Sequence, residues 1–153
     1  MIDQPISPDI FRLIVRHTPL VSIDLVMEDE NGYVLVGLRN NEPARGSWFV
    51  PGGVIRKNEA MGDAFGRILA TETGRHANIK DAEFLGVYQH FYDTNRFQEP
   101  GYGTHYVVQG YRLRLGPRPH IALDDQHSTI RWMVPAEILE APDVHENTKA
   151  YFR

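Results

Sequence analysis

The run from Ala60 to Thr73 constrains the fold more than any other part of the chain, because its apolar residues recur at helical spacing. They form one stripe with Ala64 at its edge: Met61, Phe65, Ile68 and Leu69. Glu72 comes one helical turn after Ile68 and therefore projects from that stripe. A carboxylate on a core-facing surface is costly unless it is paired or binds a metal. Three interpretations stay open: an ion pair with Arg67, a frayed helix end that leaves Glu72 in water, or a metal ligand.

The first third of the chain predicts a helix, a hairpin and a short strand. Ser7-Pro8-Asp9 is typical of a helix start, and Thr18-Pro19 of a helix end. Two β-rich runs flank Glu30-Asn31-Gly32, and Asn-Gly between such runs is the strongest short signal for a hairpin. The apolar run 47–50 predicts a short buried strand, which we expect a turn at Pro51-Gly52-Gly53 to close.

The rest of the chain predicts further strands with helices between and after them. Gly74 ends the helix that begins at Ala60. The other expected elements are strands at 82–92, 105–115 and 129–133 and helices at 135–139 and 145–152. A hairpin within such an order excludes a purely parallel sheet. We therefore expect an α/β (α+β) fold, a mixed β-sheet sandwiched between helices, in a single domain over residues 1–153.

Composition narrows the chemistry that the chain can perform. The sequence has no cysteine, which excludes disulfides, thiolate metal sites and a cysteine nucleophile. Its formal net charge of -4 argues against a surface that binds nucleic acid without sequence preference. No apolar run reaches the roughly 20 residues that span a bilayer, and the N-terminus lacks a signal-peptide pattern. We expect a cytoplasmic protein that uses hydroxyls, histidines, carboxylates, arginines or an oxygen-bound metal.

The glycine pair before the helix suggests where a metal could bind. Glycine lets the backbone approach a ligand closely, and Gly52-Gly53 directly precede the loop that leads to the helix with Glu72. A hard cation such as Mg²⁺ takes backbone carbonyl and carboxylate oxygens and keeps positions for water and substrate phosphates. A glycine turn followed by a helix with an inward carboxylate is a plausible way to build such a site.

The same segment resembles the Nudix box. Gly53, Glu59, Arg67, Glu72 and Gly74 stand at the positions of that pattern without a gap. Three positions depart from it, since Ile68 and Thr71 replace glutamates and Arg75 replaces an apolar residue. In most Nudix hydrolases those glutamates help to hold several metal ions and to activate water for attack on phosphorus. Their loss puts that common mechanism in doubt for this chain.

The resemblance extends to the GDP-mannose mannosyl hydrolase branch of the superfamily, which has this degenerate box. The matching stretches cover almost the whole chain: TPLVSIDLV, GSWFVPGG, GVYQHFYD, THYVV, DDQH followed by Trp132, and VHENTKAYF. The branch implies a Nudix fold and hydrolysis of GDP-mannose, with GDP-glucose as a second substrate. The reaction it implies is attack at the anomeric carbon with inversion, giving GDP and the free sugar. It also implies a homodimer, with the N-terminal helix near the interface.

The resemblance assigns one Mg²⁺, which Mn²⁺ can replace, to the diphosphate. Its implied ligands are Glu72, Gln126 and a backbone carbonyl of Gly52 or Gly53, with substrate oxygens completing the shell. His127 corresponds to the general base, and a neutral imidazole can take a proton from water near pH 7. Without that context, a loop histidine is more often a surface residue.

Further residues are implied to surround the diphosphate and the sugar. Arg39 and Arg67 match arginines that the family implies around the leaving diphosphate, which a planar guanidinium group suits. The alternative for Arg67 is a pair with a glutamate of its own helix. Asp24 and Tyr106 match positions near the sugar and the phosphates, with a satisfied core acid and a core aromatic as the alternatives. His90 is a weaker candidate for the sugar site, and an interior histidine bonded to the backbone is an equal interpretation for it and for His105.

Other residues leave alternatives open. The branch commonly carries an arginine directly after the second glycine, where this chain has Val54, so we hypothesise that Arg56 replaces it on the same face of an extended segment. His145 and Asn147 are interpreted as caps of the last helix. The apolar residues of the first helix agree with burial against the same chain or a partner: Ile10, Leu13 and Ile14.

Two other functions remain open from sequence. One is an ordinary Nudix pyrophosphohydrolase that cleaves a P–O bond, which Ile68 and Thr71 oppose because such a site needs more carboxylates than this helix offers. The other is a non-catalytic module that binds a nucleotide sugar, which the retained His127 opposes. Partners other than a GDP-sugar and a second copy are not expected, neither nucleic acid nor membrane.

Overall fold

The structure is a computed structural model that describes residues 6–121 and 127–153. Its centre is a mixed sheet with the strand order β3-β2-β1-β6-β5, while β4 pairs with β1 and β7 pairs with β2. The strands are β1 (Leu20–Asp29), β2 (Val34–Arg39), β3 (Trp48–Phe49), β4 (Gly52–Val54), β5 (Glu83–Tyr92), β6 (Thr104–Gly116) and β7 (His127–Met133). The α-helices are α1 (Pro8–His17), α2 (Met61–Thr73), α3 (Pro135–Glu140) and α4 (Glu146–Lys149), and two 3₁₀ turns are η1 (Ile79–Asp81) and η2 (Ala150–Phe152).

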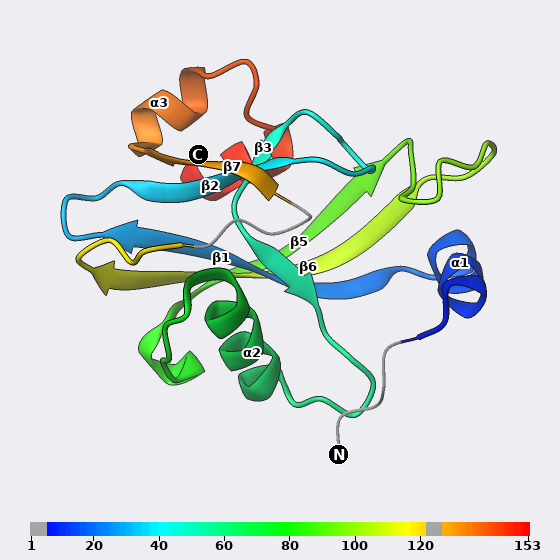
Figure 1. Cartoon of the computed structure of the whole chain (residues 1–153), viewed down its shortest axis with the longest axis horizontal. Helices are drawn as coiled ribbons and strands as arrows, with labels where there is room; N and C mark the ends of the chain where they lie inside the picture. Colours follow the sequence, from blue (N-terminus) through cyan, green and yellow to red (C-terminus); the bar gives the residue numbers. More distant parts are fainter. Residues whose placement is uncertain (1–5, 122–126) are drawn as a thin grey trace.

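Helices cover both faces of this sheet, as the sequence predicts. Figure 1 shows α2 against one face and the C-terminal elements α3, α4 and η2 against the other, with α1 at one end. Strands β1 and β6 run parallel, whereas β1 and β2 form the predicted antiparallel hairpin. The side chain of Asp29 fixes the hairpin turn, because its Oδ1 accepts hydrogen bonds from the backbone of Asn31 and Tyr33. Among the described residues, no helix is long and apolar enough to cross a membrane.

The alternation of β1 divides the core between these two faces. Successive strand residues point to opposite sides of a sheet. One cluster packs under α2 and includes Ile23, Leu25, Met27, Phe65 and Leu69. The other packs under the C-terminal elements and includes Val26, Val34, Val36, Ile138 and Tyr151. Asp24, between Ile23 and Leu25, therefore points to the face that the C-terminal elements cover.

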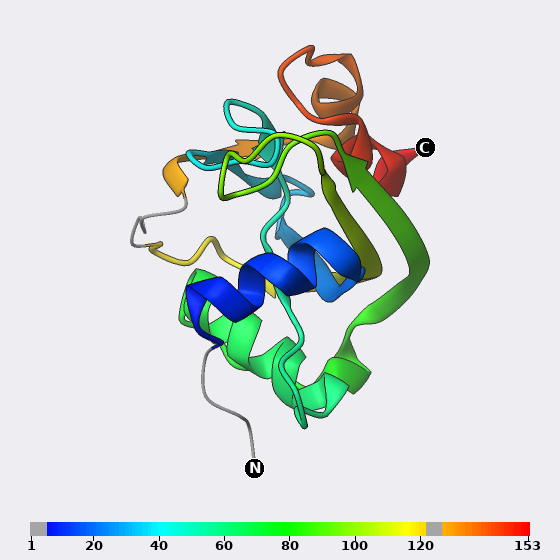
Figure 2. The same ribbon diagram turned by 90° about the vertical axis from the view of Figure 1, so that its right-hand side faces the viewer.

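Two helices expose, within this chain, some of the apolar residues that their sequence patterns single out. In α1 the buried residue is Val15, whereas Ile10 and Leu13 are 56% and 57% exposed. The reason is that α1 packs on the loop of residues 93–103 through its other side, where Phe11 contacts Phe97. Figure 2 shows α1 crossing in front of the sheet rather than within a layer. In α2, the first residue Met61 is 49% exposed because it lies at the solvent end of the stripe.

The glycine pair forms a strand instead of the predicted turn. Strand β4 pairs antiparallel with β1, with Asp24 opposite Gly52 and Ile23 opposite Gly53. A Cβ on Gly52 would lie 2.3 Å from Asp24 Oδ1 and 2.5 Å from the carbonyl oxygen of Ile23. A Cβ on Gly53 would lie 3.0 Å from Cγ1 of Ile68 on α2. The glycines are thus required for close packing between the sheet and α2, not for a bend.

We expect Gly52→Ala to lower the free energy of unfolding by about 2 kcal/mol or more, because the new methyl group meets backbone that cannot move freely. Gly66 is the matched control, since a Cβ at this position in α2 meets no atom within 4 Å. Gly66→Ala should raise the free energy of unfolding by about 0.5–1 kcal/mol. Urea unfolding measures both changes, and a Gly52→Ala protein as stable as the wild type would contradict the packing described.

Candidate active site

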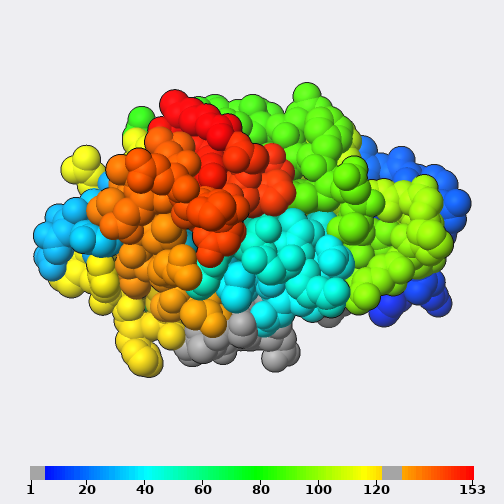
Figure 3. Space-filling view, turned by 90° about the horizontal axis from the view of Figure 1, so that it is seen from above, coloured from blue at the N-terminus to red at the C-terminus, as the bar shows by residue number. Residues whose placement is uncertain are grey.

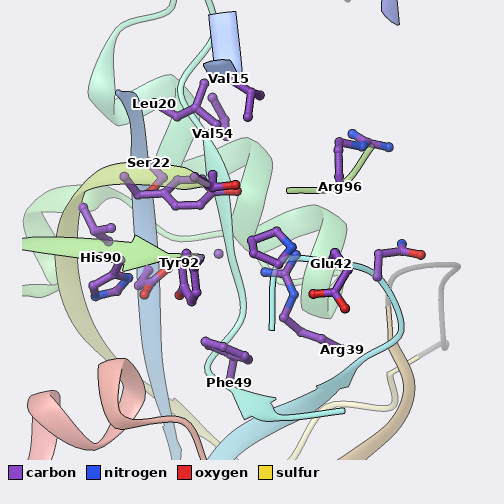
Figure 4. A pocket seen from close by; sticks show the side chains of 18 of the residues that line it. Val15, Leu20, Ser22, Arg39, Glu42, Phe49, Val54, His90, Tyr92 and Arg96 are labelled. Atoms are coloured by element: carbon purple, nitrogen blue, oxygen red, sulfur yellow. The ribbon is translucent and has the colours of Figure 1, made fainter. Parts of the chain in front are cut away.

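A cavity of about 380 Å³ opens at the end of the sheet where β1 and β6 begin and β5 finishes. Its floor comes from one face of these strands, because the register sets Ser22 beside Val108 and Tyr106 beside His90. The other lining residues come from α1, β2, β3 and the residue that follows it, β4, and the loops 40–47 and 93–103. Figure 4 shows these side chains converging on a common space. Of the sequence-predicted site residues, the cavity brings together Asp24, Arg39, Gly52, Gly53, His90 and Tyr106.

Asp24 is a half-buried acid on the floor of this cavity. Its Oδ2 accepts a hydrogen bond of 2.7 Å from the hydroxyl of Tyr151 in η2. Burial raises the pKa of Asp24 to about 7, against the opposing effects of the Tyr151 hydrogen bond and the Arg39 charge. A carboxyl group with such a pKa changes charge near neutrality, which is common at active sites.

Arg39 supplies positive charge at the end of β2. Its guanidinium carbon lies 5.5 Å from the centre of the Phe49 ring. Its Nε is buried and has no hydrogen-bond partner among the described residues. A buried donor without a partner costs free energy, and a charged donor costs more. An anionic ligand in the cavity would remove that cost, so Arg39 fits the phosphate contact expected from sequence.

His90 and two tyrosines form the aromatic side of the cavity. Burial lowers the pKa of His90 to about 4, with a smaller contribution from His145, so the imidazole is neutral at pH 7. Its Nε2 has no partner among the described residues. Burial also raises the pKa of Tyr92 to about 12 and that of Tyr106, so both hydroxyls keep their protons. His105, by contrast, stacks on Phe91 and does not line the cavity.

Arg67 is held by Glu59, which precedes its helix. Its Nε lies 2.7 Å from Glu59 Oε2, and its Nη2 donates to Glu59 Oε1 and to the carbonyl oxygen of Val54. Glu59 also accepts from the backbone N–H of Arg56, and the neighbouring Arg67 hydrogen bond holds the pKa of Glu59 below its usual range. Arg67 is not among the cavity-lining residues. The pair ties the β4–α2 loop to the helix.

The residues around Gly53 fit a hard cation. The predicted metal ligand Glu72 is half-buried on α2, one turn beyond the Ile68 side chain that packs on Gly53. Backbone carbonyls of β4 and the Glu72 carboxylate offer the oxygen donors that Mg²⁺ prefers. Within the described part of the chain there is no group of three or more His, Asp or Glu side chains that could hold a metal together.

Two predicted residues fall in or beside a part of the chain that the structure leaves out. Gln126 lies outside the described residues, and so does the side chain of His127. The main chain of His127 is described and pairs with Arg39 at the start of β7. The main chain of His127, the predicted base, therefore pairs with the strand that carries Arg39.

Arg56 lies at the turn that follows β4. The strand ends at Val54, the backbone N–H of Ile55 still donates to the carbonyl oxygen of Val21, and the N–H of Glu59 then donates to the carbonyl oxygen of Arg56. The exposed Arg56 does not line the cavity, and its contact with a phosphate stays a prediction. Val54 itself does line the cavity.

Arg96 is a second cavity cation that the sequence analysis missed. It lies in loop 93–103, whose fold depends on the fully buried Asn95: the Asn95 side chain bonds to the backbone of Phe97, Glu99 and Tyr102. Loop 40–47 meets this loop where Thr94 Oγ1 donates to Glu42 Oε2 at 2.7 Å. Figure 3 shows loop 40–47 between loop 93–103 and the C-terminal elements. A buried asparagine within a polar loop gives no periodic signal, so only the fold reveals Arg96.

Comparison with known proteins places this geometry in a family. A model described as NUDIX domain matches residues 18–153. The chain belongs to the Nudix family. The mixed sheet between helices is therefore the Nudix α/β fold, and the protein is a Nudix-type hydrolase. Nudix enzymes generally use a divalent metal such as Mg²⁺, in agreement with the donor set around Gly53.

Curated Nudix relatives and solved structures support the assignment. The low-salt glycan biosynthesis protein Agl8 of Haloferax volcanii is 41% identical over 130 residues, 85% of this chain and 80% of Agl8. An ADP-ribose pyrophosphatase of Methanocaldococcus jannaschii is 34% identical over 70 residues, 46% of this chain and 40% of that protein. The structure of a MutT protein from Methanosarcina mazei Go1 superposes with a TM-score of 0.70 at 16% identity, covering 89% of this chain and 92% of that one. That of a MutT NUDIX hydrolase from Burkholderia pseudomallei gives 0.70 at 23% identity, covering 89% and 97%.

The placement of the two arginines separates their expected effects. Arg96 lines the cavity and Arg56 does not. We therefore expect Arg96→Ala to raise KM for a nucleoside diphosphate derivative about tenfold or more. Arg56→Ala should change this KM less than about twofold. Steady-state kinetics at saturating Mg²⁺ measure both. A larger effect at Arg56 than at Arg96 would show that the cavity described is not where the diphosphate binds.

Proposed function

We propose that this Nudix protein hydrolyses GDP-mannose, and GDP-glucose as a second substrate, at the anomeric carbon with Mg²⁺ or Mn²⁺, giving GDP and the inverted free sugar. The observation that carries the proposal is that α2 has fewer carboxylates than the common Nudix box. Where the common Nudix box has glutamates, this chain has Thr71 and Ile68, and Ile68 is 2% exposed within the core. Attack on phosphorus with several metal ions needs those carboxylates. Departure of GDP as a leaving group needs one metal and cationic side chains.

The proposed roles place the diphosphate near the two cavity arginines and the sugar near Asp24 and His90. Arg39 and Arg96 bind the diphosphate, and their charge stabilises GDP as the bond to the sugar breaks. Asp24 and His90 lie beside the sugar, where the neutral imidazole bonds a sugar hydroxyl through its unpartnered Nε2. The Asp24 carboxylate faces positive charge that develops at the anomeric carbon in the transition state. Tyr106 contacts the phosphates or the sugar from β6.

Glu72, Gln126 and a backbone carbonyl of Gly52 or Gly53 would hold the Mg²⁺ ion. When bound, this ion neutralises charge on the diphosphate and so improves it as a leaving group. Glu72 would be the single carboxylate ligand, and the substrate would supply the other anionic oxygens. Arg67 contributes indirectly by fixing the loop between β4 and α2 through Glu59.

His127 is the proposed general base. An inverting attack requires a base on the face of the anomeric carbon opposite the leaving diphosphate, with room for a water molecule. The backbone pairing with Arg39 anchors β7 beside the strand that carries the phosphate-binding arginine. The base would take its proton from water, because the product sugar retains the oxygen of that water.

The relatives bear on the choice of substrate. The name of Agl8 refers to glycan biosynthesis, a process that consumes activated sugars, and this supports a nucleotide sugar. The name of the M. jannaschii protein refers to ADP-ribose pyrophosphatase activity, which supports the competing cleavage of a P–O bond. That match covers 46% of this chain, against 85% for Agl8. The two reactions differ in products and in the position of the new oxygen.

The decisive experiment measures the products in ¹⁸O-labelled water. With GDP-mannose and Mg²⁺, we expect GDP without GMP, and the label in mannose rather than in phosphate. A panel with GDP-glucose, ADP-ribose and UDP-glucose tests the sugar and base preference in the same assay. GMP with labelled phosphate would overturn the glycosyl hydrolase proposal in favour of a pyrophosphohydrolase. Binding of the nucleotide sugar without turnover would favour a non-catalytic module.

We further propose that the protein acts as a homodimer through α1. The helix exposes Ile10 and Leu13 at 56% and 57%, and Ile6 just before it is 49% exposed, while Phe11 and Val15 of the helix line the cavity. A second copy is the partner that would cover this apolar side. Light scattering should give a dimer for the wild type and a monomer for Leu13→Glu. A wild-type monomer at micromolar concentration would contradict the proposal.

A further inference from the structure

Tyr151 is a buried tyrosine near the cavity that the sequence analysis did not single out. It is 6% exposed and does not line the cavity. Its hydroxyl lies 2.7 Å from Asp24 Oδ2 although the two residues are 127 positions apart in the chain. Burial raises the pKa of Tyr151, so the hydroxyl keeps its proton and can only donate to the carboxylate.

Two glycines flank Asp24 in the sheet and leave space for this hydrogen bond. Asp24 on β1 lies opposite Gly52 on β4 and beside Gly110 on β6. A Cβ on Gly110 would lie 2.8 Å from Cε1 of Tyr151, and a Cβ on Gly52 would lie 2.3 Å from Asp24 Oδ1. The Tyr151 ring thus occupies the space that a side chain at Gly110 would fill, and the Asp24 carboxylate occupies the space that one at Gly52 would fill. A side chain at either glycine would displace one of the two partners.

The backbone that carries Tyr151 is tied to the cavity wall at several points. The N–H of Trp48 donates to the carbonyl of Asp143, and the N–H of His145 donates to the carbonyl of Trp48. The hydroxyl of Thr148 accepts from the backbone N–H of Val50, a cavity residue. The Tyr88 ring then packs edge-on against Tyr151 with 4.7 Å between ring centres. These contacts fix the position of the hydroxyl independently of Asp24.

Other groups that face Asp24 do not fix its orientation in this way. Arg39 on β2 acts on Asp24 through charge. Tyr92 on β5 and Tyr106 on β6 lie close enough to Asp24 for its charge to raise their pKa values. The hydrogen bond from Tyr151 is the one that the described residues make to the Asp24 side chain. The Tyr151 hydroxyl binds Oδ2, and Oδ1 lies beside Gly52 of β4, which lines the cavity.

We propose that Tyr151 is a positioning residue of the active site, whose hydroxyl holds the Asp24 carboxylate in the one orientation that presents Oδ1 to the substrate. This inference rests on the proposed function, in which Asp24 meets positive charge that appears only in the transition state. Misorientation of Asp24 then costs transition-state binding and leaves ground-state binding of the diphosphate intact. Tyr151 acts through Asp24 and does not touch the substrate.

The test compares Tyr151→Phe with the matched control Tyr88→Phe, which removes a hydroxyl from the same aromatic cluster. At pH 8 we expect Tyr151→Phe to lower kcat for GDP-mannose about tenfold or more, with KM changed less than about threefold. Tyr88→Phe should leave both unchanged. In an Asp24→Asn background, Tyr151→Phe should lower kcat less than about twofold further, because the two residues act as one unit. Equal effects in both backgrounds would overturn the inference.

A second measurement separates this inference from the proposed function. A crystal structure of Tyr151→Phe without substrate should show the Asp24 side chain turned from its wild-type orientation, with the ring of residue 151 in place over Gly110. An unchanged Asp24 would overturn the positioning role whatever the enzyme's reaction. Wild-type protein that releases GMP instead of GDP would refute the proposed function, while the orientation of Asp24 in the two structures would still decide the role of Tyr151.

Discussion

The site depends on one packing constraint, which is that β4 has no side chain where it passes between β1 and α2. Gly53 faces Ile68 of the helix, and Gly52 faces Asp24 of the central strand. The absence of these two Cβ atoms brings the helix with Glu72 close to the sheet and lets a carboxylate enter the cavity. Gly53 therefore allows α2 to pack on the sheet, and Gly52 allows the Asp24 side chain to reach the cavity.

The ion pair between Glu59 and Arg67, outside the cavity, holds α2 against the end of β4 and the loop that follows it. The side chain of Glu59 is fully buried, and Arg67 satisfies both of its oxygens. A third hydrogen bond from Arg67 reaches the last residue of β4. A buried carboxylate is stabilised only when its oxygens are paired, so the glutamate and the arginine depend on each other. This explains in physical terms why the box requires both residues at a fixed separation: their pairing closes the loop between strand and helix.

Much of the fold was predictable because local patterns dictate it. The Asn-Gly hairpin, the stop of α2 at Gly74 and the cap of α4 by His145 all depend on residues within a few positions of one another. The resemblance then named Asp24, Arg39, His90 and Tyr106, which the cavity does bring together. The sequence could not reveal Arg96 or Tyr151, because their places depend on a loop folded around Asn95 and on a contact across 127 positions. The amphipathic pattern of α1 also does not say whether its apolar side faces the same chain or a partner.

The attachment of α1 has a consequence for how the cavity's roof can change. Arginines over aromatic rings join the helix to loop 93–103, as Arg12 does over Phe97, Arg96 over Phe11 and Arg16 over Tyr102. Val15 is the buried residue of α1, whereas the floor of the cavity comes from β1, β5 and β6. A helix with one buried residue is expected to open more easily than the paired strands of a sheet. Substitutions in α1 would therefore change the part of the cavity that Phe11 and Val15 line with less effect on the sheet than substitutions in the floor.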